Sequence, residues 1–413
     1  MKTKVVAVFG YNNNRIYDVY KIKDLVKNKC NAEIVLIKKN ITSLDRDVSP
    51  YCFDFEPSDH EIVLPLMNYL DKNSLDLIGC LPFSDKGVVG AAHVAKKLNL
   101  FGDSEATSLA MLDKLEFRKL EQKIEMNAEE YKKPFFYILH SKKELEALLS
   151  KVGPYFLKPT NEGNSRGCMK IETTRDLDIW MIDHSNSLKV GVICEEVLSN
   201  KNEYSFDGVN GAYWITKKFT TEGSYRAEYQ HVVPAPFNTE ENNRIYSILT
   251  PFLKKLGSNG GAFHHEFFIL DDNRVASVEP NRRPAGMWLW DLASWAFDGF
   301  NPWEQWIDLC SNRNPKGVDL KKNNFAGVRG VISKKDGAIH FLQKERAAKE
   351  LAKIFGDNFR LSFLKEEKSI VRKEPRDNSD FLAFIAIKNK NYEKLLSDLE
   401  LAEKIILNCI EVS

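Results

Sequence analysis

The side chains best suited to chemistry lie in one stretch, GGAFHHEFFILDDNRVASVEPNRRPAGMWLW, at residues 260–290. Its pattern predicts a strand from Phe263 to Leu270, a tight turn at Asp272-Asn273 and a second strand from Arg274 to Pro280. Alternate residues of a strand point to the same face of a sheet. We therefore expect several polar side chains to gather at one end of this hairpin: His264, Glu266, Glu279, Asn281 and Arg283.

These residue types favour binding of a metal ion and an anion. Carboxylate and amide oxygens suit Mg²⁺, which proteins commonly hold through one or two carboxylates plus substrate phosphates. The guanidinium of Arg283 suits a phosphate or a carboxylate bound through two parallel hydrogen bonds. The alternative is a surface hairpin with scattered charges, which is the commoner fate of Glu and Arg.

Composition excludes several classes of protein. The chain has 413 residues, 43% hydrophobic and 28% charged, which is typical of a globular protein with two or three domains. A net charge of +1 provides no electrostatic basis for binding nucleic acid or an acidic membrane surface. Seven scattered cysteines without CxxC pairs indicate reduced thiols, and we find neither a signal peptide nor a membrane-spanning run. We therefore expect a cytoplasmic protein without nucleic-acid or membrane partners.

The first part of the chain, residues 1–102, alternates predicted strands with helices. This alternation predicts a small Rossmann-like α/β domain with a parallel sheet. Ligands of such sheets bind beyond the carboxyl ends of the strands. Gly10-Tyr11-Asn12 and Pro82-Phe83-Ser84-Asp85 are therefore candidate substrate edges.

The middle part, residues 103–323, opens with one long predicted helix through ATSLAMLDKLEFRKLEQK. Lys114 and Arg118 lie four residues apart and share a face of that helix. A solvated face is the default interpretation, and contact with phosphates is the alternative. The last part, residues 324–413, is predicted to be an α+β cap that begins with a hairpin turning at Asp336-Gly337.

Further segments of the middle part have groups that could bind a nucleotide. The predicted strand Tyr155–Pro159 ends in Lys158-Pro159 and leads into residues 160–168, a loop with two glycines and small polar residues. Backbone N–H groups and hydroxyls of such a loop can donate to phosphates, although a flexible hairpin loop is the simpler interpretation. Glu195-Glu196-Val197-Leu198 offers backbone groups in a linker-like position, and Glu203 follows it.

In this order, Lys158-Pro159, the loop 160–168, Glu195-Glu196-Val197-Leu198 with Glu203, and Glu266…Glu279-x-Asn281 resemble the ATP-grasp superfamily of carboxylate–amine ligases. The two last carboxylates are thirteen residues apart across a hairpin, which looks like that family's Mg²⁺ site. The resemblance implies a chain of class α/β and α+β. An ATP-grasp domain over residues 103–323, with a nucleotide lid at about 130–197, would lie between the Rossmann-like domain and the C-terminal α+β cap.

The resemblance also implies a role for individual residues. Lys114 and Lys158 would contact the phosphates or the adenine edge, and Ser165 and Gly167 would lie in the loop that closes on the phosphates. Glu195, Glu196, Val197 and Leu198 would form the adenine hinge, with Glu203 on the ribose and Lys217 or Lys218 reaching the phosphate chain. Glu266, Glu279 and Asn281 would hold Mg²⁺, with Mn²⁺ as an alternative, and Arg283 with help from His264 would bind the carboxylate or its acyl phosphate.

The implied reaction is ATP-dependent formation of an amide between two small molecules, with amino acids as the expected class, through an acyl phosphate. Two other interpretations remain open: a biotin-carboxylase-like or purine-pathway ATP-grasp enzyme, and a non-catalytic module that binds nucleotide and regulates a partner. The sequence leaves the carboxylate, the amine and the oligomeric state open, with a homodimer as one option.

Overall fold

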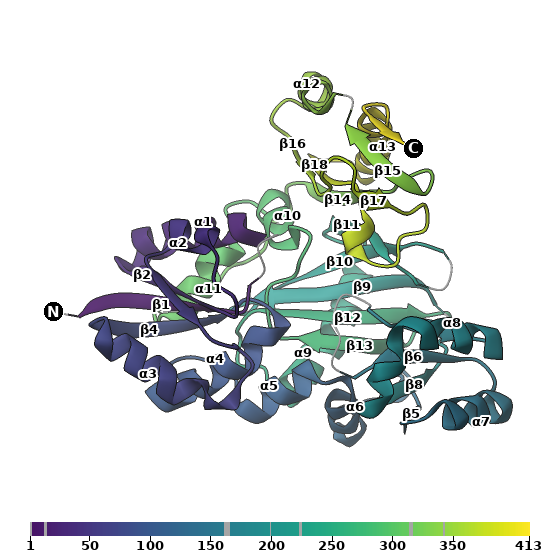
Figure 1. Ribbon diagram of the computed structural model, residues 1–413, viewed down its shortest axis with the longest axis horizontal. Coiled ribbons are helices and arrows are strands. Elements are labelled where there is room, and N and C mark those ends of the chain that lie inside the picture. Colours follow the sequence, from purple (N-terminus) through teal and green to yellow (C-terminus); the bar gives the residue numbers. More distant parts are fainter. Residues whose placement is uncertain are drawn as a thin grey trace.

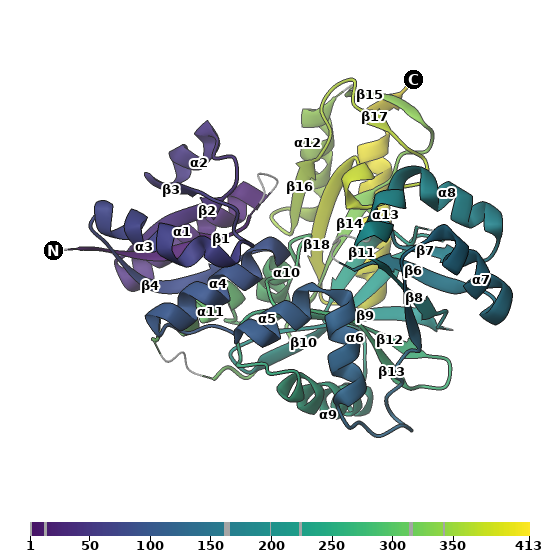
Figure 2. The same ribbon diagram turned by 60° about the horizontal axis from the view of Figure 1, so that its bottom comes forward.

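A computed structural model describes residues 2–11, 15–160, 166–198, 200–222, 225–313, 317–341 and 343–413. Figure 1 shows the N-terminal part at the left, a long central sheet, a small sheet with two helices at the lower right, and the C-terminal part at the top. Figure 2 shows the same parts from below. No helix among these residues combines the length and the apolar composition that a membrane crossing requires.

The N-terminal part has a four-stranded sheet of order β3-β2-β1-β4, and all its strands are parallel, as the sequence predicted. Strand β3, the short edge strand, was not predicted. The last five residues of β1 are completely buried, because helices cover both faces of the sheet. The elements are β1 (Thr3–Phe9), α1 (Ile16–Cys30), β2 (Glu33–Lys38), α2 (Ser43–Val48), β3 (Tyr51–Asp54), η2 (His60–Ile62), α3 (Val63–Lys72), β4 (Leu75–Pro82) and α4 (Asp85–Leu98).

The single long helix predicted after Ser104 is wrong, because the chain forms two helices, α5 (Glu105–Leu112) and α6 (Lys114–Lys123). Asp113 between them has an extended backbone, and its carboxylate accepts hydrogen bonds from Leu115 N and Glu116 N at 2.8 and 3.1 Å. A side-chain acceptor at this position satisfies the free N–H groups of a new helix. Asp113 therefore ends one helix and starts the next.

A second, smaller sheet of order β5-β8-β6-β7 is antiparallel throughout. Its elements are β5 (Phe136–Leu139), α7 (Lys142–Val152), β6 (Tyr155–Pro159), β7 (Met169–Ile171), α8 (Thr174–His184), η3 (Ser185–Lys189) and β8 (Val192–Glu196). Helices α7 and α8 share one apolar core with the inner residues of the strands and therefore cover the same face. We call this unit, residues 136–196, the lid.

The central sheet has eight strands in the order β13-β12-β9-β10-β11-β14-β18-β16, and every neighbouring pair is antiparallel. Helices α5, α6 and α9 pack on one face of its first half through one shared apolar core. The elements not yet introduced are β9 (Asn200–Val209), β10 (Ala212–Thr220), β11 (Glu228–Val233), α9 (Thr239–Lys255), β12 (Phe263–Leu270), β13 (Val275–Asn281), α10 (Leu289–Ala296), α11 (Pro302–Cys310), β14 (Phe325–Val331), β16 (Phe359–Phe363) and β18 (Ala383–Asn389).

The C-terminal part extends the central sheet, because β14, β18 and β16 continue it beyond β11. The hairpin predicted to turn at Asp336-Gly337 is wrong. Strand β14 pairs with β11 and β18, whereas β15 belongs to a separate three-stranded sheet with β17 and β19. The remaining elements are β15 (Gly337–Phe341), α12 (Lys344–Phe355), β17 (Ile370–Val371), η4 (Asn378–Asp380), α13 (Tyr392–Leu407) and β19 (Ile410–Val412). The domain boundaries at 102 and 323 stay predictions.

Candidate functional site

A cavity of about 710 Å³ lies between the lid and the face of the central sheet that α9 leaves uncovered. Its walls come from segments far apart in the sequence. Most of the predicted site residues line it: Lys114, Lys158, Glu195, Glu196, Val197, Leu198, Glu203, His264, Glu266, Glu279 and Arg283. The cavity therefore brings together residues that the sequence analysis selected from separate motifs.

The predicted hairpin is confirmed as β12 and β13, with Glu266 directly opposite Glu279 and His264 opposite Asn281. The register shifts just after this pair, so that Phe267 faces Ser277 and Val278 is the extra residue of a bulge. As a result, the adjacent residues Val278 and Glu279 both line the cavity. The alternation also buries Phe263 and Phe267 on the opposite face, against α9.

Two neighbouring side chains hold Glu279 in the cavity wall. The Asn281 side-chain amide donates to its Oε1 at 2.8 Å, and the Lys114 ammonium lies 3.2 Å from its Oε2. Glu266 and Glu279 are on facing strand positions, and with Asn281 they carry carboxylate and amide oxygens, the ligand types that a hard divalent cation takes. Glu266, Glu279 and Asn281 are the residues that would hold it.

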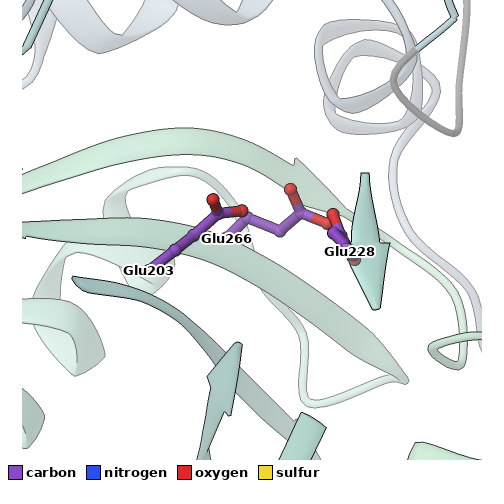
Figure 3. A group of neighbouring side chains, drawn as sticks. All are labelled: Glu203, Glu228 and Glu266. Carbon is purple, nitrogen blue, oxygen red and sulfur yellow. The ribbon is translucent and has the colours of Figure 1, made fainter. Parts of the chain in front are cut away.

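Three carboxylates, those of Glu203, Glu228 and Glu266, lie within 4.8 Å of one another (Figure 3). The Lys218 ammonium lies among them, 2.8, 2.7 and 3.1 Å from the three side chains in that order. Lys218 is on β10, directly opposite Glu203 of β9, which explains part of this cluster. The Lys218 ammonium therefore neutralises part of the negative charge of the three carboxylates.

This arrangement separates the two lysines that the sequence analysis left open. The Lys218 side chain is completely buried behind the three carboxylates, whereas Lys217 points to the other side of the strand and lies over the Phe219 ring. Burial lowers the pKa of Lys217. The pKa of Lys218 is instead raised well above its ordinary value, because the three carboxylates outweigh the effect of burial.

His264 links the hairpin to the middle of the sheet. Its Nδ1 lies 2.6 Å from Asp207 Oδ1, and its Nε2 lies 3.0 Å from Glu266 Oε1. Burial alone would lower the pKa of His264, but Asp207 and Glu266 raise it to about 9. The imidazole is therefore protonated at neutral pH and donates to both carboxylates.

Arg283 connects the hairpin to the N-terminal part. Its Nε and Nη2 donate to the two carboxylate oxygens of Asp85 at 2.8 and 3.2 Å. Asp85 is the first residue of α4 and belongs to the predicted substrate edge that starts at Pro82. This fork places Arg283 in the cavity wall with an acidic partner from the N-terminal part.

At the lid, Glu195 lies between two cations. Arg118 Nε donates to its Oε1 at 2.6 Å and Lys158 Nζ to its Oε2 at 2.7 Å. Burial would raise the pKa of Glu195, but the two cations lower it to about 2. The neighbouring Glu196 accepts from Phe135 N at 2.7 Å and pairs with Lys132 at 2.9 Å. Both side chains of this predicted hinge are therefore already bound to the protein.

The loop predicted to close on phosphates is described only at its ends. Ser165 lies outside the described residues. Gly167 has a φ of +68°, and an added Cβ would lie 2.8 Å from Pro159, so this position requires glycine. Its carbonyl accepts a hydrogen bond from Trp180 of α8 at 2.7 Å, and the next residue, Cys168, lines the cavity. Gly167 therefore fixes the returning end of the loop against the lid.

The sequence analysis missed several residues of the site. Glu228 and His231 of β11 line the cavity, with His231 Nε2 3.4 Å from Glu228 Oε2, and burial lowers the pKa of His231. The sequence analysis predicted no strand in their segment. Asp207 was also missed, although it accepts from the side chains of Ser205 and Thr216 at 2.6 and 2.7 Å and is thereby held in place beside His264. No local pattern marks these three residues, because their roles depend on pairing between strands.

Comparison with known proteins identifies the fold of this chain. No family model matches the sequence. The structure superimposes on that of the L-amino acid ligase from Bacillus licheniformis with a TM-score of 0.76, at 15% identity and over 100% of this chain and 99% of that one. It also matches the biotin carboxylase domain of the Hydrogenobacter thermophilus 2-oxoglutarate carboxylase, with a TM-score of 0.67 at 12% identity, over 100% of this chain and 91% of that one. This chain has the ATP-grasp fold.

A curated relative agrees with this assignment. The D-alanine–D-alanine ligase of Oceanobacillus iheyensis is 27% identical over 199 residues, which are 44% of this chain and 54% of that protein. The chain thus spans about half the length of the curated relative that it matches. The ATP-grasp fold expected from the order of the motifs is confirmed, whereas the nucleotide lid at about 130–197 stays a prediction.

Proposed function

We propose that this chain is an ATP- and Mg²⁺-dependent carboxylate–amine ligase that joins two small molecules, with amino acids as the substrate class. The observation that carries the proposal is the convergence in one cavity of the lid residues, the β12–β13 carboxylates and Arg283. The similarity to two ligases of amino acids supports the substrate class. The biotin carboxylase domain is described in complex with MgADP, which supports the choice of nucleotide and metal.

In this proposal the nucleotide lies between the lid and the central sheet. Val197 and Leu198 would offer backbone groups to the adenine, next to the carboxylates of Glu195 and Glu196. Glu203 would accept hydrogen bonds from the ribose. The loop that contains Ser165 and ends at Gly167 would cover the phosphates, and Lys114 and Lys158 would donate to them. Lys218 would act indirectly, by holding the carboxylates of Glu203, Glu228 and Glu266 in place from behind the cavity wall.

Mg²⁺ would be held by Glu266, Glu279 and Asn281, with Mn²⁺ as a substitute. When bound, the metal would neutralise charge on the phosphates during transfer. Lys114 now lies against Glu279 and would turn toward the phosphates once this carboxylate has a metal partner. Positioning and charge neutralisation are what phosphoryl transfer requires, and no protein nucleophile is needed.

Arg283 would orient the substrate carboxylate, and the protonated His264 would hold Glu266 in place beside it. A carboxylate oxygen would attack the γ-phosphorus, the bond to ADP would break, and an acyl phosphate would form. The amine nitrogen of the second substrate would then attack the acyl carbon, phosphate would leave, and the amine would lose a proton. Exclusion of water by the lid would protect the acyl phosphate from hydrolysis.

The test is release of phosphate from ATP and Mg²⁺ with a panel of amino acids, singly and in pairs, followed by mass spectrometry of the products. We expect release that requires two substrates and yields ADP and an amide. Release with bicarbonate in place of an amino acid would instead assign the chain to the biotin-carboxylase-like class. ATP binding without turnover under every condition would assign it to nucleotide-binding modules without catalysis. Size-exclusion chromatography would show whether it forms the homodimer that the sequence analysis left open.

A further inference from the structure

Arg118 makes several contacts in the site, although no sequence motif gave it a specific role there. It lies on α6, one turn after Lys114, and its side chain is 1% exposed. Its three donor nitrogens bind three different elements: Nε donates to Glu195 of β8 at 2.6 Å, Nη1 to Glu121 of α6 at 2.7 Å, and Nη2 to the Ser277 carbonyl of β13 at 2.9 Å. It therefore connects the lid strand that forms the cavity wall to the strand of Glu279. The solvated helix face, the default sequence interpretation, is wrong for this residue.

We infer that Arg118 is a positioning residue for nucleotide binding: it fixes the Glu195 carboxylate and leaves Lys158 available to the ligand. This inference rests on the proposed function, since it assumes that the ligand of the cavity is a nucleotide. Arg118 itself does not line the cavity, whereas Glu195 and Lys158 both do. Its effect on the ligand is therefore transmitted through these two side chains.

The charges explain why two cations are needed. Arg118 and Lys158 face the carboxylates of Glu195 and Glu121, so the buried group is neutral as a whole. Glu121 has a further donor in the Tyr131 hydroxyl at 2.5 Å. With Arg118 present, each oxygen of Glu195 has its own cation. Without it, Lys158 would be the sole cation for a buried carboxylate and would be held more tightly, at the expense of its contact with the ligand.

The same contacts predict a preference for a base that donates a hydrogen bond. A carboxylate fixed by two cations stays ionised and can only accept, so it favours an exocyclic amine and disfavours a carbonyl oxygen at the same place. The preference for ATP over inosine triphosphate is therefore a readout of how the Glu195 carboxylate is held. A merely structural role of Arg118 would not change this selectivity.

The experiment measures the dissociation constants of ATP and of inosine triphosphate for the full chain, together with KM and kcat. The variants are Arg118→Met, which removes the charge at similar length, and Arg118→Lys, which keeps the charge but reaches fewer partners. The matched control is Lys119→Met, because the next residue of the same helix is half-exposed and pairs with Glu116. We expect Arg118→Met to weaken ATP binding by roughly 10- to 100-fold and to reduce the preference for ATP over inosine triphosphate. The kcat should change by less than about 3-fold, because the reacting atoms lie elsewhere.

The ATP affinity and the selectivity of Arg118→Lys should lie between those of the unsubstituted chain and those of Arg118→Met. This variant also provides the test if Arg118→Met does not fold. Unchanged ATP affinity and unchanged selectivity in a folded variant would overturn the inference while leaving the proposed function intact. Failure of the unsubstituted chain to bind ATP would overturn the proposed function and the inference with it.

Discussion

At the scale of single residues, the site is organised by buried charges that neutralise one another. Lys218 serves three carboxylates, Glu195 is shared by two cations, and His264 lies between Asp207 and Glu266. Buried charges of this kind are costly unless each has partners. Their mutual pairing therefore fixes the positions of these charged side chains in and behind the cavity wall.

Removing the Lys218 ammonium should therefore destabilise the fold. Lys218→Gln leaves three carboxylates together without their cation, and we expect a loss of about 3–5 kcal/mol in the free energy of unfolding at pH 7. Urea denaturation measures this loss. The control is Lys217→Gln, on the opposite face of the same strand, which should change stability by less than about 0.5 kcal/mol.

The free energy of unfolding of Lys218→Gln should also depend on pH, and the direction of this dependence follows from the carboxylates. Without Lys218, the pKa of the clustered carboxylates in the folded chain should rise above that in the unfolded chain, because like charges are forced together. A group with a raised folded pKa stabilises the fold as pH falls. The difference between Lys218→Gln and the unsubstituted chain should therefore shrink between pH 8 and pH 5.5, and a difference that grows would contradict this account.

Glu279 should be essential for turnover and of little consequence for folding. Glu279→Gln keeps the shape and the contact with Asn281 but replaces a charged carboxylate ligand with a neutral amide, so we expect phosphate release to fall by roughly 100-fold or more. Asp272→Asn, in the exposed turn of the same hairpin, is the control and should keep full activity. Activity retained by Glu279→Gln would remove this residue from the metal site.

At the scale of elements, the site depends on where helices and strands begin. Helix α6 starts at Lys114 because Asp113 caps it, and this start directs Lys114 and Arg118 toward the cavity and the lid. A continuous helix through this point would turn both cations to a different side, since each residue adds about 100° of rotation.

Asp113→Ala should therefore lower the free energy of unfolding by about 0.5–2 kcal/mol, as for other lost N-caps. It should also weaken ATP binding, because the direction of α6 is no longer fixed. Asp113→Asn keeps an acceptor at the cap and should restore most of both properties. Thermal unfolding and ATP titration measure the two properties. Equal losses in Asp113→Ala and Asp113→Asn would show that the charge of Asp113, and not its hydrogen bonds to the helix, supports stability and ATP binding.

At the scale of the whole molecule, the central sheet joins the site to the C-terminal part. Strand β11, which holds Glu228 and His231, is paired on one side with β10 and on the other with β14. The cavity also receives Asp377 and Asn378 from the C-terminal part. Strands β14, β18 and β16 of the C-terminal part thus belong to the same sheet as the candidate metal ligands.

A chain that ends at residue 323 should therefore fail to fold cooperatively. The truncation removes β14, β16 and β18 together with α13, leaves the edge of β11 unpaired and uncovers Val232 of β11, which belongs to the apolar core of the removed elements. We expect aggregation in size-exclusion chromatography and loss of a cooperative thermal transition. A soluble, cooperatively folded fragment would instead establish a true domain boundary at this position.

Local pattern in the sequence was enough to predict the hairpin, the parallel N-terminal sheet and the order of the motifs. Alternation along a strand determines which side chains lie on the same face, and turn residues mark where a hairpin reverses. Both signals come from residues that are close together in the chain. Alternation alone therefore assigns Glu266, Glu279 and Asn281 to one end of the hairpin, and the register of β12 with β13 agrees with that assignment.

Only the tertiary structure decided which charges meet. Lys218 contacts Glu203, Glu228 and Glu266 because β9, β10, β11 and β12 pair in one register, and Arg283 meets Asp85 because the N-terminal part packs against the hairpin. Pairing of strands and domains depends on interactions between distant segments, which no local periodicity contains. For the same reason Arg118 has the pattern of an exposed helix residue in the sequence, whereas in the folded chain it is the buried link between the lid and the strand of Glu279.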